Sequence, residues 1–317
     1  MKKVYDIAKV CFFLLSLVLM YYLLDHIGFA NIKDSFIKIG FVGAATLVLM
    51  GFVENVLDSA SLKYASPKNI PLYKVHAINS VGGILNSVFP WEAGEFVKSI
   101  LIKKDTTLNE AVMGVVLYNF IFKISKPVAI FVTMIAAIFL KVESDITYIV
   151  LIFASSLISF IPYIAISLLI KFSAVTKISK LAGKVTKRDL SVFIDKVDQF
   201  ESAVSKFRQR RGKSFFLVFF LQFSGRMMSL ITFLLAAWLI GDVTDIFAIL
   251  ILSHAAINLA NYVVMLVPAK LGVAESTSYL IFSMLGLDGG FGIMVTLILR
   301  IKALFTQGVS CLLLLFL

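Results

Sequence analysis

Charged residues are scarce in this chain. Lys, Arg, Asp and Glu together make up 15% of its 317 residues, whereas hydrophobic residues make up 60%. Soluble domains carry about 25% charged and about 45–50% apolar residues. The composition therefore excludes an ordinary soluble domain and predicts an all-α polytopic membrane protein, a helical bundle forming a single membrane domain over residues 1–317.

Cysteine is equally scarce. Cys11 and Cys311 both lie in apolar stretches, which excludes a disulfide framework and a cysteine-based metal site. The sequence also lacks a nucleotide-binding loop and a nucleophile motif. We therefore expect no cofactor and no metal, and no ATP-driven pump unless a partner supplies ATP. No small-residue cleavage site follows the apolar run 10–24, which predicts a retained first span rather than a signal peptide.

The positive charge is concentrated in one segment. Residues 171–213 hold twelve Lys/Arg and four acidic residues, a net charge of +8. The positive-inside rule places this loop and the N-terminus in the cytoplasm, with the chain in the cell membrane. No aromatic-interleaved groove accompanies the charge, so we expect no nucleic-acid partner.

This orientation organises the hydrophobic runs. They predict about six full spans and two re-entrant, broken helical hairpins. The spans lie near residues 8–24, 39–62, 107–140, 146–170, 214–240 and from about 290, and residues 25–38 form an outer loop. In this topology, twenty basic residues face the cytoplasm and three face outside. The asymmetry supports the assigned sidedness.

The basic loop contains an amphipathic pattern. Between Asp189 and Arg208 the apolar residues recur at gaps of three and four, which predicts a helix with a charged outer face. Thr186 to Asp189 form its expected capping box. Binding of this helix to anionic headgroups and packing on the inner end of the bundle both remain open.

The two hairpins, at residues 75–103 and 246–287, read as copies of one another. His76 precedes Pro90 by fourteen residues, as His254 precedes Pro268. A glycine follows each proline four residues on (Gly94, Gly272), and asparagines recur in both first arms. The first hairpin is entered from inside and the second from outside. Half 1 (residues 1–141) and half 2 (145–317) are therefore predicted to be inverted repeats, an architecture of transporters.

Charged residues within the first turn mark a functional site. Glu92, Glu95 and Lys98 recur at spacings of three, so they can share one helical face. A charge at membrane depth costs at least about 2.5–3.5 kcal/mol and is a functional candidate by default. Half-helices starting after Pro90 and Pro268 would direct their N–H groups at an anion. An internal Glu95–Lys98 salt bridge is the alternative.

Further polar residues lie within the apolar segments. The guanidinium groups of Arg226 and Arg300 are the best candidates to bind phosphate bidentately, unless they form structural pairs with Glu275, Glu95, Glu54 or Asp58. The predicted cavity is completed by a set of polar residues that includes proton-responsive histidine candidates. The full set of predicted substrate-binding residues is Glu92, Glu95, Lys98, Arg226, Lys270, Glu275 and Arg300, and the cavity set is His76, Asn79, His254 and Asn258.

The chain resembles the transmembrane, flippase-like region of the lysylphosphatidylglycerol synthase family over nearly its whole length. The resemblance rests on Pro90 to Lys98 (PWEAGEFVK), on Pro268 to Glu275 (PAKLGVAE) and on Arg300. Ala274 stands where the family usually has a basic residue, and Asn119 and Lys123 stand where acids are common. The resemblance implies lipid translocation between leaflets. It does not imply lysyl-lipid synthesis, because the soluble synthase domain is absent from this sequence.

Taken together, these observations predict a secondary or passive translocase for an anionic phospholipid or lipid-linked phosphate. Its expected partner is the membrane lipid itself, and homo-oligomerisation stays open. Two other classes remain as alternatives. One is a membrane-embedded transferase, or a subunit of one, with Glu92 or Glu95 as base. The other is a scaffold that recruits enzymes through residues 171–213.

Overall fold

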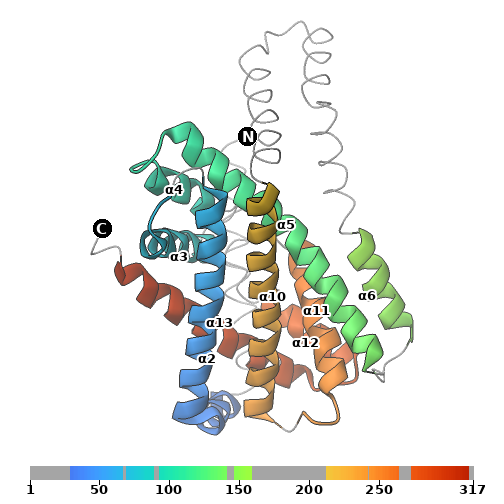
Figure 1. Ribbon diagram of the computed structural model, residues 1–317. Helices are drawn as coiled ribbons and strands as arrows, with labels where there is room; N and C mark the ends of the chain where they lie inside the picture. Colours follow the sequence, from blue (N-terminus) through green and yellow to red (C-terminus); the bar gives the residue numbers. More distant parts are fainter. Residues whose placement is uncertain are drawn as a thin grey trace, which may run out of the picture.

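The computed structural model describes residues 29–66, 69–88, 93–140, 146–158, 212–241, 243–263 and 273–313. Every regular element in these ranges is a helix (Figure 1). In chain order they are α2 (Phe29–Ala65), α3 (Leu72–Val88), α4 (Ala93–Ile102), α5 (Leu108–Phe139), α6 (Ile146–Ile158), α10 (Gly212–Ile240), α11 (Phe247–Val263), α12 (Val273–Met284) and α13 (Gly289–Cys311). The expected all-helical fold is confirmed over the described part of the chain.

Four described helices are long and apolar enough to cross a membrane: Ile37–Ala65, Glu110–Phe139, Ser214–Ile240 and Gly289–Cys311. They coincide with four of the predicted spans, and the protein is an integral membrane protein. The predicted span 8–24 and the amphipathic segment 189–208 lie outside the described residues. Of the predicted span 146–170, the described part is the 13-residue helix α6.

The outer loop predicted for residues 25–38 is wrong from Phe29 onward. The chain is helical from Phe29, and the helix is interrupted at Gly40, where φ is 61° and ψ is 177°. A positive φ suits glycine because it has no Cβ. The polar residues of this stretch favoured a loop in the sequence analysis, but they form a short helix. At Gly40 the chain changes direction between this helix and the membrane-spanning part of α2.

Two pairs of shorter helices lie between the long ones. α3 packs on α4, and α11 packs on α12. Their lengths are 17, 10, 17 and 12 residues, or about 15–26 Å at 1.5 Å per residue, less than the ~30 Å hydrocarbon core. These pairs occupy the positions of the two predicted hairpins. Their connecting turns, which include Pro90 and Pro268, lie outside the described residues.

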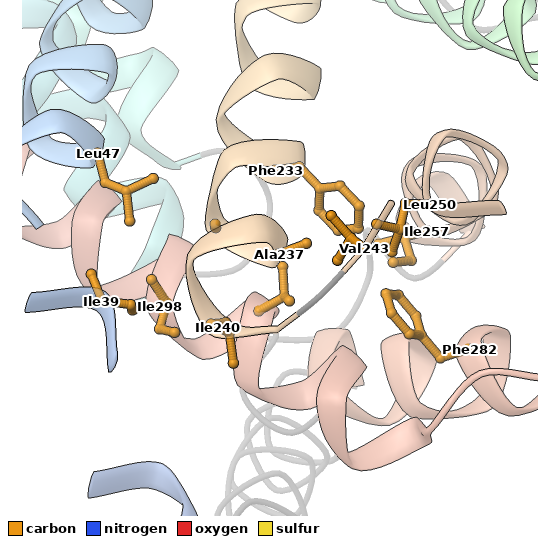
Figure 2. Packing of buried hydrophobic residues seen from close by; sticks show 12 residues of the cluster. Ile39, Leu47, Phe233, Ala237, Ile240, Val243, Leu250, Ile257, Phe282 and Ile298 are labelled. Carbon is orange, nitrogen blue, oxygen red and sulfur yellow. The ribbon is translucent and has the colours of Figure 1, made fainter. Parts of the chain in front are cut away.

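The long helices α2 and α10 lie side by side in the centre of the molecule (Figure 1). Hydrophobic side chains from both meet others from α11, α12 and α13 in one cluster (Figure 2). Phe282, Ala236 and Leu250 are fully buried there. This apolar core holds the second hairpin against the central helices.

Two glycines allow close contact within the first hairpin. A Cβ added to Gly94 would lie 1.9 Å from the carbonyl oxygen of Gly82, and one added to Gly82 would lie 2.3 Å from Lys98 Cε. Real side chains do not tolerate such separations. The glycines therefore bring α4 against α3 and leave room for the Lys98 side chain.

We expect Gly94→Ala to destabilise the protein by about 1–3 kcal/mol, because the new methyl group overlaps backbone atoms of α3. Thermal unfolding in detergent measures the effect. Gly308→Ala is the matched control, since a Cβ there meets nothing within 4 Å and alanine favours the helix. Equal melting temperatures for Gly94→Ala and the wild type would contradict the close packing.

Candidate functional site

Glu95 is the centre of a polar cluster in the first hairpin. Its Oε1 accepts hydrogen bonds from Asn86 Nδ2 at 2.8 Å and Lys98 Nζ at 2.7 Å, and its Oε2 accepts one from Asn119 Nδ2 at 2.8 Å. These donors come from α3, α4 and α5. Both carboxylate oxygens are therefore satisfied by the protein itself, and the predicted Glu95–Lys98 pair forms within α4.

Lys98 is sealed inside this cluster. Its side chain is 4% exposed, and its Nζ lies 4.9 Å from the ring centroid of Tyr118. The aromatic ring adds a favourable cation–π contact to the ion pair. The Asn86 side chain also accepts from the Gly94 amide at 2.7 Å, which satisfies an otherwise free N–H at the start of α4. In this state the cluster is closed and fully paired.

A second buried ion pair joins α12 to α13. Arg300 Nη1 donates to Glu275 Oε1, and the Glu275 side chain is 2% exposed. Glu275 Oε2 is buried without a hydrogen-bond donor among the described residues. The Glu275 site therefore keeps capacity for one more donor, and Arg300 itself is 21% exposed.

The neighbouring pair connects the two halves of the chain. Lys302 Nζ on α13 donates to Glu54 Oε2 on α2 at 2.9 Å, and Thr232 on α10 donates to the other oxygen of Glu54. Lys302 is 8% exposed. The expectation that buried basic residues need acidic partners thus holds for Arg300 and Lys302. Arg226, in contrast, forms no ion pair with an acidic side chain among the described residues.

Arg226 instead faces a cavity between α5, α10 and α11. Its lining is basic, polar and apolar without an acidic side chain among the described residues: Lys126, Ala129, Ile130, Thr133, Arg226, Met227, Ser229, His254 and Asn258. Arg226 lies at the middle of α10. Its guanidinium carbon is 4.6 Å from the ring centroid of Phe122, and its Nε finds no hydrogen-bond acceptor within the described part of the chain.

The two corresponding histidines have different surroundings. His76 is held by two hydroxyls, with Ser59 Oγ 3.0 Å from Nδ1 and Ser310 Oγ 2.9 Å from Nε2. His254 has Asn258 Nδ2 at 3.1 Å and lines the basic cavity. Of the four predicted cavity residues, His254 and Asn258 reach this cavity, whereas His76 and Asn79 belong to a closed hydrogen-bonded network.

The structure thus divides the predicted site residues into three groups. Glu95 and Lys98 form one cluster, Glu275 and Arg300 form another, and Arg226 lines the cavity with His254 and Asn258. Three further predicted residues are described and lie in none of these groups: His76, Asn79 and Gly94. The other five lie outside the described ranges: Glu92, Pro90, Pro268, Lys270 and Gly272. The predicted meeting of the two hairpin turns therefore concerns residues outside the described part of the chain.

Two further residues contribute. The sequence left two interpretations open for Lys126, a wet cavity beside a kink or the neutralisation of a nearby acid, and its side chain lines the basic cavity from α5. Asn119 was noted only as a departure from the resembled family, and it donates to Glu95. Asn119 lies as many residues after Thr107, the N-cap of α5, as Arg300 lies after Asp288, the N-cap of α13. This matching position in the two long helices is the sequence signal that could have identified Asn119.

Arg300→Met is expected to destabilise the protein by about 3–5 kcal/mol, because it leaves the Glu275 carboxylate buried and unpaired. Glu275→Gln should have a smaller effect, since the amide oxygen of glutamine can still accept a hydrogen bond from Arg300. Unfolding in detergent compares the variants. The double variant R300M/E275L should recover stability relative to Arg300→Met alone. Additive losses in the double variant would show that the pair is not coupled.

Comparison with known proteins places these features in a family. Residues 9–311 match the family model described as lysylphosphatidylglycerol synthase TM region. No curated protein and no solved structure matches the chain. The match covers nearly the whole chain and relates it to membrane proteins of lipid modification or flipping. The chain therefore belongs to the family of the lysylphosphatidylglycerol synthase transmembrane region.

Proposed function

We propose that this protein is a translocase that moves an anionic phospholipid, or a lipid-linked phosphate, between the membrane leaflets. The observation that carries the proposal is the basic cavity lined by Lys126, Arg226 and His254 without an acidic side chain among the described residues. A phosphate group supplies the negative charge and the acceptor oxygens that this lining is suited to bind. The acyl or prenyl tails would remain in the bilayer.

The energetic argument rests on Arg226. A positive charge at the middle of a membrane-spanning helix costs about 2.5–3.5 kcal/mol unless it is compensated. Arg226 has a ring contact to Phe122 and an unsatisfied Nε, whereas Arg300 and Lys302 are each paired with glutamate. Binding of a phosphate would both compensate the charge and use the planar donor fork of the guanidinium.

The packing of the helices supports an inverted repeat as the basis of this transport. In this relation α2, α3, α4 and α5 correspond to α10, α11, α12 and α13. The contact of α4 with α5 then corresponds to that of α12 with α13, and the contact of α3 with α13 to that of α11 with α5. The contact of α2 with α13 likewise corresponds to that of α10 with α5. Each contact has a counterpart when the series α2–α5 is exchanged with the series α10–α13. In the proposed mechanism, rocking of one half against the other exposes the cavity to alternate leaflets.

The paired contacts near the hairpins fit the same relation. Asn119 lies twelve residues after the N-cap Thr107 and donates to Glu95. Arg300 lies twelve residues after the N-cap Asp288 and donates to Glu275. Each link joins the second arm of a hairpin to the next long helix. We infer that these links hold the hairpins in place while the halves move, so Glu95 and Glu275 act as structural anchors of the pathway.

Arg226→Gln is expected to slow the crossing of a fluorescent phosphatidylglycerol by about tenfold or more, because it removes a charge-assisted hydrogen bond to phosphate. The measurement is the protection of the lipid from an external quencher in proteoliposomes. Lys103→Gln is the control, since Lys103 is exposed and lies outside the cavity. An unchanged rate for Arg226→Gln in folded protein would overturn the assignment of the cavity.

The transferase alternative makes a different prediction. A transferase changes the mass of its lipid, whereas a translocase returns the lipid unaltered. The three donors bound to Glu95 also hold its carboxylate within the protein as a hydrogen-bond acceptor in this state. We expect mass spectrometry of lipid extract incubated with the purified protein to detect no new product, and a product dependent on Glu95 would establish the enzyme instead.

A further inference from the structure

Asp58 and Asn79 form a polar contact between α2 and α3, away from the basic cavity. Asn79 Nδ2 donates to Asp58 Oδ2 at 2.9 Å, and the Tyr118 hydroxyl donates to the same oxygen at 2.7 Å. Asn79 is 7% exposed. One oxygen of the Asp58 carboxylate is therefore well satisfied by neutral donors from α3 and α5.

The other oxygens of this contact have no donor. Asp58 Oδ1 and Asn79 Oδ1 are both buried, and neither has a hydrogen-bond partner among the described residues. Rotating the Asn79 amide does not resolve this, because it would turn an oxygen toward Asp58 Oδ2 and remove the bond from Nδ2 to Ser59 Oγ at 3.3 Å. Two buried acceptors without a donor are unusual in a folded protein.

The contact also lacks a compensating charge. No described Lys, Arg or His forms an ion pair with Asp58. An unpaired carboxylate taken out of water is strongly unfavourable. A buried water molecule would supply hydrogens to both oxygens but would not neutralise the charge. One positive charge satisfies both requirements.

We propose that Asp58 Oδ1 and Asn79 Oδ1 bind one sodium ion. The ion would take the two oxygens as hard ligands and complete its shell with water. The single carboxylate matches the single positive charge of the ion.

The charged and titratable groups around Asp58 are all assigned to other contacts. On α3, His76 reaches Asn79 through Ser59. On α4, Lys98 pairs with Glu95 and lies over the Tyr118 ring. On α5, Tyr118 is the direct donor. Arg226 on α10 lies over Phe122, and Glu54 on α2 pairs with Lys302 of α13.

This network gives the cation a route to influence the hairpin. Asp58 contacts Tyr118, whose ring lies beneath the Lys98 ammonium that is paired to Glu95. Binding or release of a positive charge at Asp58 would therefore change the electrostatic balance of the Glu95 cluster. The proposal concerns cation binding alone and stands independently of lipid translocation, so it is tested without lipid transport.

The test measures the melting temperature of the purified protein in detergent at constant ionic strength. Sodium chloride replaces choline chloride at fixed pH. A bound cation stabilises the folded state, so the melting temperature should rise by about 2 °C or more as sodium increases.

Asp58→Asn should abolish that response, because the amide is neutral and its own NH₂ group can donate to Asn79 Oδ1. Asp245→Asn is the matched control at an exposed aspartate and should keep the wild-type response. Asn79→Ala provides a second variant and should raise the sodium concentration needed for half the effect by about tenfold. Wild-type protein that does not respond to sodium, or variants at Asp58 and Asn79 that respond as the wild type does, would overturn the proposal.

Discussion

The absence of water in a bilayer governs this structure, because every charge within the membrane must find its counter-charge inside the protein. Three buried carboxylates follow this rule directly. Glu95 pairs with Lys98, Glu275 with Arg300, and Glu54 with Lys302. The second and third pairs connect different helices. Ion pairs therefore hold neighbouring helices together here, as apolar packing does elsewhere in the core.

The same rule makes the exceptions informative. Arg226 lies in the middle of a long apolar helix and borders a cavity with Lys126, while Asp58 keeps a buried oxygen without a donor. One site has positive charge in excess and the other negative charge. We interpret the first as a place for a phosphate and the second as a place for a small cation. The two sites share no residue among those described, so they offer distinct points for substrate and ion.

Residues at corresponding positions of the two hairpins have different surroundings. His76 is held by Ser59 and Ser310, whereas His254 borders the basic cavity. Asn119 donates to Glu95, whereas Arg300 donates to Glu275. The proposed phosphate site lies between α5 of the first half and α10 and α11 of the second.

The sequence alone determined the membrane class, four long helices and the positions of both hairpins. The length and hydrophobicity of a segment are local properties, and they decide directly whether that segment can span a bilayer. It also offered the pairing of Glu95 with Lys98 as one of two interpretations, since residues three apart can share a helical face. Only the tertiary structure decided the partners distant in the chain, such as Glu54 with Lys302 and Asn119 with Glu95. It also brought Lys126, Arg226 and His254 to one cavity and left Asp58 beside Asn79. Those outcomes depend on how helices rotate and cross when they pack, and no local pattern of residues encodes that geometry.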